Sequence, residues 1–140
     1  MINQDVVKLD VGNMKKGPCI VGVAKKKILS NIGISFDNEL EIVLWKDRLK
    51  HIEKHKKDFD SEEEYQLHLE SIPDIINNPD YIGIHPKGHS IEYVKRVDKV
   101  VLVAVRIKES GQLSVRTLYP LKENKLNNYL KSGRMKMIEK

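Results

Sequence analysis

The sequence has little of what several classes of protein require. It contains one cysteine, and no apolar run approaches the length of about 20 residues that a membrane-spanning helix needs. Cys19 alone cannot form an internal disulfide, and one isolated thiol is too little for a structural zinc site. The opening MINQDVVKLD has neither the basic segment nor the apolar core of a secretion signal. These absences predict a cytoplasmic protein that does not contact a membrane.

The chain also has no internal repeat and no low-complexity tract. Apolar residues make up 40% of it and charged residues 32%, which is typical of a globular protein. A length of 140 residues suits one domain with a buried core. We therefore expect a single domain over residues 1–140, with an N-terminal extension or ribbon over 1–40 and a core over 41–134.

Positive charge is concentrated in the C-terminal part. The net charge is +5, but residues 87–140 hold 13 Lys and Arg against 5 Asp and Glu, which gives +8. Residues 1–86 hold 12 against 15, which gives −3. This asymmetry favours a polyanionic partner such as nucleic acid, although lysine-rich surfaces also serve solubility.

The N-terminal segment shows short strand signals. β-Branched runs at Val6–Leu9 and Ile20–Val23, separated by glycines and a proline, predict a β-ribbon. Residues 25–33 (KKKILSNIG) predict one or two helical turns, and residues 40–45 (LEIVLW) predict a strand.

Two helices are expected next. Apolar residues recur with a helical period over residues 46–59 and again over residues 60–72. Asp60 or Ser61 is the expected N-cap of the second helix. Pro73 either breaks it or begins another turn.

Beyond residue 80 the spacing of apolar residues changes from a helical period to runs typical of β-strands. Four β-rich runs separated by turn residues are predicted strands: 81–85, 90–97, 99–108 and 112–120. A polar helix over 122–133 follows, with Gly133 as its stop. The fold class expected is α+β, with N-terminal helices packed on a four-stranded antiparallel β-meander, an N-terminal β-ribbon and a C-terminal helix.

The stretch LKHIEKHKKDF carries two histidines, His51 and His55, four residues apart. The spacing is similar to that of a zinc-protease helix, but Glu53 comes one residue too late to lie over a metal-bound water. The lysines around the pair would repel a dication, and no third ligand is indicated. We expect no metal and no cofactor.

Two readings of the histidine pair stay open. A histidine on a charged helix is usually a solvated surface residue. On a helical wheel, however, Arg48, His51 and His55 cluster beside the stripe formed by Trp45, Leu49 and Ile52, at the rim of the core. A half-buried position of this kind suits a reactive side chain.

RNA phosphodiester cleavage gives such a histidine pair a chemical purpose. RNA supplies its own nucleophile, the 2′-hydroxyl, so an enzyme needs a base, an acid and cations for the developing phosphorane charge. Histidine titrates near neutrality and suits both proton transfers. Lysine and arginine can stabilise the negative charge that develops on the phosphorane.

Several motifs in this order resemble a known family. LWKDRLKHIEKH, a following helix, IPDIINNPDYI, SIEYVKRVDK, VVLVAVRIKE and LSVRTLYP resemble the phage-associated nucleases of the barnase, EndoU, colicin and RelE superfamily. The shared features are a histidine pair, a Pro-Asp turn, an aromatic-x-Lys strand and a final strand with Thr near an aromatic residue and a proline. The resemblance covers residues 42 to about 134.

The resemblance implies site residues. It assigns His51 and His55 the general base and general acid roles or a phosphate contact, and Lys95 and Arg116 the stabilisation of phosphorane charge. Thr117 is the implied hydrogen-bond donor to a phosphate oxygen.

Four further residues are candidate substrate contacts. Arg48 and Ser90 are candidates for phosphate, and Tyr93 and Tyr119 for base stacking. Each has an ordinary structural alternative, a solvated cation or turn residue in the first two cases and strand packing in the tyrosines.

Strand alternation limits this set. Ile91, Tyr93 and Lys95 share one face of their strand. Arg116 and Thr117 are adjacent, so they cannot both enter one cleft unless a bulge intervenes.

The sequence hypothesis is a metal-independent endoribonuclease of phage or mobile-element toxin type that leaves a 2′,3′-cyclic phosphate. Its expected partner is RNA, either tRNA or other cellular RNA, with an immunity protein or antitoxin as a candidate partner. The alternatives are a non-catalytic nucleic-acid-binding module and an inactive nuclease-fold protein-interaction domain.

Overall fold

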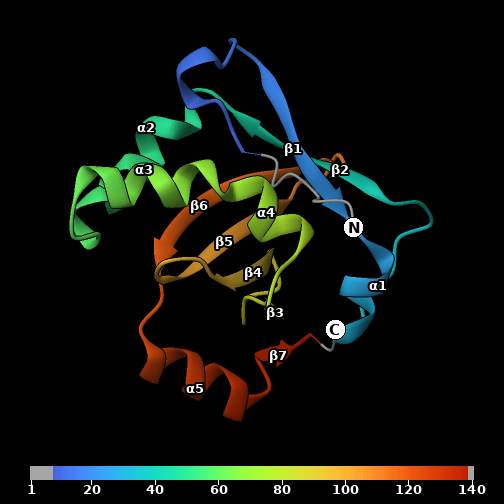
Figure 1. Cartoon of the computed structure of the whole chain (residues 1–140). Coiled ribbons are helices and arrows are strands. Elements are labelled where there is room, and N and C mark those ends of the chain that lie inside the picture. Colours follow the sequence, from blue (N-terminus) through green and yellow to red (C-terminus); the bar gives the residue numbers. More distant parts are fainter. Residues whose placement is uncertain (1–7, 139–140) are drawn as a thin grey trace, which may run out of the picture.

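The computed structural model describes residues 8–138, which form an α+β fold around one mostly antiparallel sheet (Figure 1). The strands are β1 (Pro18–Ala24), β2 (Leu40–Trp45), β3 (Tyr81–Ile84), β4 (Ser90–Arg96), β5 (Val100–Ile107), β6 (Leu113–Pro120) and β7 (Met135–Met137). The α-helices are α1 (Lys26–Leu29), α2 (Arg48–Ile52), α3 (Glu62–Glu70), α4 (Ile72–Asn77) and α5 (Glu123–Ser132). Three 3₁₀ turns are η1 (Val11–Asn13), η2 (Ser30–Ile32) and η3 (Glu53–Asp58).

The strand order in the sheet is β1-β2-β6-β5-β4-β3-β7. Strands β3 to β6 follow one another in the chain and pair antiparallel with their neighbours. The pair β1 and β2 lies on one side of them and β7 on the other. The expected α+β class is therefore correct, but the sheet has seven strands within residues 8–138 rather than four.

Strand β2 joins β6 through a short parallel contact. Only Ile42 and Val43 pair, with Leu113 and Ser114. Beyond these pairs Leu44 and Trp45 pair with β1 alone, and the chain then turns into α2 and η3, which both contact β6. The second half of β6 is thereby covered by the segment that carries the histidine pair.

Strand β6 contains a bulge opposite β5. Ala104 pairs with Thr117 whereas Val105 pairs with Val115, so Arg116 is the extra residue. A bulge of this kind shifts the alternation of side chains along the strand. The main-chain oxygen of Arg116 accepts a hydrogen bond from Arg48 Nε at 2.7 Å, which ties α2 to the bulge.

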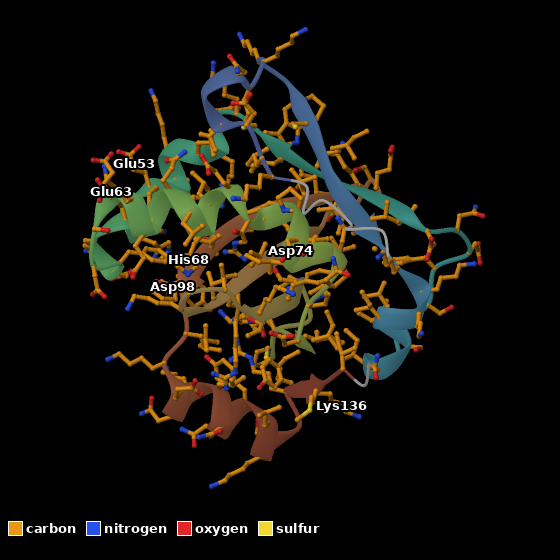
Figure 2. All side chains as sticks on the ribbon, in the orientation of Figure 1. Glu53, Glu63, His68, Asp74, Asp98 and Lys136 are labelled. Atoms are coloured by element: carbon orange, nitrogen blue, oxygen red, sulfur yellow. The ribbon has the colours of Figure 1, made fainter. Side chains whose placement is uncertain are left out.

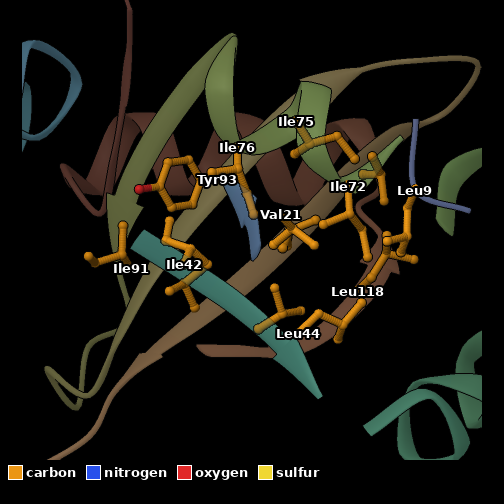
Figure 3. Close-up of a cluster of buried hydrophobic side chains, with 14 of the residues drawn as sticks. Leu9, Val21, Ile42, Leu44, Ile72, Ile75, Ile76, Ile91, Tyr93 and Leu118 are labelled. Carbon is orange, nitrogen blue, oxygen red and sulfur yellow. The ribbon is translucent and has the colours of Figure 1, made fainter. Parts of the chain in front are cut away.

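Apolar side chains cover both faces of the sheet. On one face, the isoleucines of α4 pack over the strands, as Figure 3 shows. On the other face, Leu126 of α5 packs on Val94, Leu102 and Met135. The uninterrupted apolar run of β5 is explained by this burial on both faces.

Two expectations about the N-terminal half need correction. Val6 lies outside the described residues, and Leu9 is a buried core residue outside any strand. The helix expected over residues 46–59 is α-helical only to Ile52 and continues as η3. The apolar period ends at Ile52, and the charged residues of η3 offer no further stripe to pack on the core.

Two polar side chains, the N-cap Ser61 and the buried His68, fix the position of helix α3. Ser61 is the N-cap, and its hydroxyl accepts from Glu64 N at 3.0 Å. His68 is fully buried and points from α3 toward the β4–β5 turn, where Asp98 lies (Figure 2). Its Nε2 accepts from Lys99 N at 2.9 Å, so the proton is on Nδ1, which donates to Glu64 O at 2.7 Å. His68 is therefore a structural residue.

Gly83 allows β7 to approach β3. A Cβ atom at this position would collide with the main-chain oxygen of Arg134. We expect Gly83→Ala to lower the free energy of unfolding by about 1–3 kcal/mol, because backbone must move to accept the methyl group. Urea denaturation measures the change. Gly12→Ala is the matched control, since Gly12 has no atom within 4 Å of an added Cβ; an equal loss in both variants would contradict the packing argument.

Candidate active site

A small pocket of about 220 Å³ brings the histidine pair against the sheet. We call it the histidine pocket. Its wall comes from α2 and η3 on one side and from β4, β5 and β6 on the other. The lining residues are His51, Lys54, His55, His85, Ser90, Glu92, Ala104, Arg116, Thr117 and Tyr119.

His51 is the exposed member of the pair and lies among cations. Its Nε2 is 3.3 Å from the ammonium of Lys54, which can only donate, so Nε2 is the acceptor. The charge of Arg48 is the main cause that lowers the pKa of His51 below its usual 6.5; smaller causes are loss of solvent and the charges of Lys54, His55 and Arg116. The neutral imidazole, whose basic nitrogen Nε2 can accept a proton as a general base does, is favoured at neutral pH.

His55 has a different environment. Its Nδ1 lies 3.1 Å from Asp58 Oδ2, and its ring lies against that of Tyr119 with centroids 5.4 Å apart. An ionised carboxylate only accepts, so the proton on Nδ1 belongs to this hydrogen bond and Nε2 is the nitrogen left for proton exchange. Asp58 thus orients His55 in the way that a carboxylate orients a catalytic histidine.

The bulge in β6 brings Arg116 and Thr117 to the same pocket. Both residues line it, which ordinary strand alternation would forbid. The Oγ1 of Thr117 is buried and has no hydrogen-bond partner among residues 8–138. A buried hydroxyl without a partner is costly, and it is a ready donor for a substrate oxygen.

Glu92 belongs to the site, and Arg134 pairs with it, although the sequence did not suggest either residue. Glu92 lines the pocket, is almost completely buried and forms a two-bonded pair with Arg134, at 2.9 and 2.7 Å. Arg134 also lies over the ring of Tyr129. The alternation of β4 was the available signal, because Ser90 and Glu92 are two residues apart and share a face.

Lys95 and Tyr93, two of the predicted site residues, lie on the opposite face of the sheet. Tyr93 is fully buried in the core under α4. Lys95 donates to Asn78 O at 2.7 Å and lies 3.6 Å from Asp74. Both residues are an odd number of positions from Ser90 along β4, so regular alternation points them to the face opposite Ser90. We correct the candidate site by leaving out Lys95 and Tyr93.

Tyr119 connects the histidine pocket to a larger one of about 820 Å³. The larger pocket is also lined by Tyr129, Arg96, Lys99 and further residues of α5 and its preceding turn. Burial, with a smaller effect of Glu92, raises the pKa of Tyr119 to about 12. The phenol therefore stays protonated and can donate a hydrogen bond at neutral pH.

Metal binding and membrane spanning each have a structural requirement. Within residues 8–138 no group of three or more His, Cys, Asp or Glu side chains is placed to hold a metal ion. No helix in the same range is both long and apolar enough to cross a membrane.

The position of Arg48 predicts a shift in the titration of His51. Replacing Arg48 with Gln removes the cation that most disfavours the imidazolium, so the pKa of His51 should rise toward 6.5. NMR titration of the imidazole resonances measures it. Lys57→Gln is the control, because Lys57 is exposed and is not among the charges that act on His51. An unchanged or lower pKa in the Arg48 variant would contradict this account.

Comparison with known proteins gives one match. A family model described as phage-Barnase-EndoU-ColicinE5/D-RelE like nuclease3 matches residues 19–128. No curated protein and no solved structure matches the chain. The matched range contains β2 to β6, all of β1 except Pro18, and the pair His51 and His55. The resemblance recognised in the sequence is confirmed. The chain belongs to this phage-type nuclease family of the barnase, EndoU, colicin and RelE kind.

Proposed function

We propose that the protein is a metal-independent endoribonuclease that cuts RNA by attack of the 2′-hydroxyl on the adjacent phosphorus. The observation that carries the proposal is the placement of two histidines in unlike environments, opposite an arginine and an unpaired hydroxyl, in one pocket. The family supports a nuclease, and this pocket supplies the groups that RNA cleavage requires.

In the proposed mechanism, His51 Nε2 takes the proton of the 2′-hydroxyl. The 2′-oxygen bonds to phosphorus, the bond from phosphorus to the 5′-oxygen breaks, and His55 Nε2 gives a proton to the leaving oxygen. The products are a 2′,3′-cyclic phosphate and a 5′-hydroxyl. Asp58 is a positioning residue that holds the ring of His55.

The charge that develops on the phosphorane is met by cations and hydrogen-bond donors. Arg116 and Lys54 supply positive charge at the pocket, and Thr117 supplies its unpaired hydroxyl. Donors that are already in place stabilise the transition state without reorganisation. The carboxylate of Glu92, which also lines the pocket, is neutralised by Arg134.

Substrate contacts follow from the same geometry. Ser90 lies at the pocket wall and is a phosphate contact, and Tyr119 offers a ring and a phenol between the two pockets. We propose cellular RNA, including tRNA, as the substrate and a cytoplasmic toxin or effector role. An immunity protein or antitoxin would inhibit the enzyme by covering this pocket.

Substitution of either histidine tests the mechanism. We expect His51→Ala and His55→Ala each to lower the rate of RNA cleavage by about 10²–10⁴-fold, because each removes one proton-transfer group. The assay is cleavage of total RNA and tRNA in EDTA, with the product ends examined for cyclic phosphate.

His89→Ala is the matched control, because His89 is exposed and does not line the pocket. It should cut RNA at the wild-type rate. If wild-type protein binds RNA but cuts none of these substrates, the chain is a binding module and the nuclease proposal is wrong.

A second pair of variants tests which face of the sheet is active. Arg116→Gln should lower the cleavage rate by about 10²–10³-fold, because a charge-stabilising donor is lost. Lys95→Gln should leave the rate close to wild type, since Lys95 lies on the other face with Asp74 and Asn78. Steady-state kinetics on one RNA substrate measures both. A large loss of cleavage in a correctly folded Lys95 variant would place the chemistry on the α4 face of the sheet and contradict the histidine pocket as the active site.

A further inference from the structure

A second, basic pocket of about 380 Å³ lies beside the histidine pocket and shares Arg116 with it. We call it the arginine pocket. It is formed by the end of β2, the start of α2 and the facing ends of β5 and β6. Its lining residues are Trp45, Asp47, Arg48, Arg106, Lys108, Ser114, Val115 and Arg116.

The arginines of the chain are divided sharply between paired and unpaired positions. The sequence has five, of which Arg96 pairs with Glu123 and Arg134 with Glu92. The other three line the arginine pocket: Arg48, Arg106 and Arg116. None of the three forms an ion pair with a carboxylate of residues 8–138.

The three guanidinium groups repel one another. Partial burial is the main cause that lowers the pKa of Arg48, and the charges of Arg116 and Arg106 lower it further. Gathering like charges in this way is unfavourable unless an anion joins them. Asp47 is the acidic residue of the lining, so the pocket keeps a cationic excess.

The uncharged part of the lining is also rich in donors. The Nε1 of Trp45 is buried and has no hydrogen-bond partner among the described residues, and an indole N–H can only donate. Lys108 lies over the Trp45 ring, with its ammonium 5.6 Å from the centroid. Ser114 adds a hydroxyl. Donors of this number and arrangement suit an anion with several acceptor oxygens, and guanidinium groups match phosphate in particular.

We propose that the arginine pocket binds a phosphodiester group of the RNA strand next to the one that is cut in the histidine pocket. The shared residue Arg116 makes the two pockets adjacent, so one strand can occupy both. The inference rests on the proposed ribonuclease function for its substrate, but phosphate binding can be measured without cleavage. It assigns Arg106, Lys108 and Trp45 a role in holding the substrate.

The test is binding of a short single-stranded DNA, which lacks the 2′-hydroxyl and is not cut by the proposed mechanism. Fluorescence anisotropy at several salt concentrations gives the affinity and its salt dependence. Arg106→Gln should weaken binding by about tenfold and reduce the slope of log affinity against log salt by about 0.7. Arg106 is exposed, so the variant should fold.

Lys131→Gln is the matched control, because it removes one exposed positive charge on α5 that lines neither pocket. It should leave affinity within experimental error of wild type. Equal effects of the two substitutions, or no effect of Arg106→Gln, would overturn the phosphate site even if RNA is cleaved. Weaker binding in Arg106→Gln alone, in a protein that cuts no RNA, would support the site and refute the ribonuclease.

Discussion

The extra residue at Arg116 in β6 decides which side chains of that strand face the two pockets and which face the core. Before it, Ser114 lines the arginine pocket, and Val115 packs in the core at the inner edge of the same pocket. After it, Thr117 faces the histidine pocket while Leu118 returns to the core. Without the bulge, alternation would bury Thr117 and expose Leu118 to the pocket. The hydrogen bond from Arg48 to the bulge then fixes α2 beside it, and α2 carries His51.

The cationic side chains of this protein fall into two groups, those paired with carboxylates and those without a carboxylate partner among the described residues. Where carboxylates are available, the cations are paired and contribute to the fold, as in the Glu92–Arg134 and Lys95–Asp74 contacts. Around the bulge, repulsion among unpaired guanidinium groups is tolerated. Such an arrangement of like charges costs stability in the free protein, and an anion bound among them would offset that cost. Three of the C-terminal cations, Arg106, Lys108 and Arg116, therefore lie together on the facing ends of β5 and β6.

Local sequence patterns predicted most helices and strands, but they did not predict which distant strands pair with one another. The run LEIVLW matches β2 residue for residue, and Ser61 is the N-cap of α3, one of the two residues expected there. The two-residue parallel contact of β2 with β6, the bulge at Arg116 and the edge strand β7 depend on long-range packing that no local period encodes. Motif likeness placed Lys95 in the site, whereas the residue of β4 that lines the pocket beside Ser90 is Glu92. Alternation along β4 from Ser90 would have indicated Glu92, because residues two apart share a face.

The change from α2 to the 3₁₀ turn η3 explains how two histidines four residues apart acquire unlike neighbours. In a 3₁₀ helix, side chains three residues apart lie above one another. Asp58 is three residues after His55 and contacts it, whereas the residue three places after His51 is Lys54. One imidazole therefore meets a carboxylate and the other meets an ammonium. This difference in neighbours arises from the order of charged residues in HIEKHKKD and from the tighter turn that His55 and Asp58 adopt.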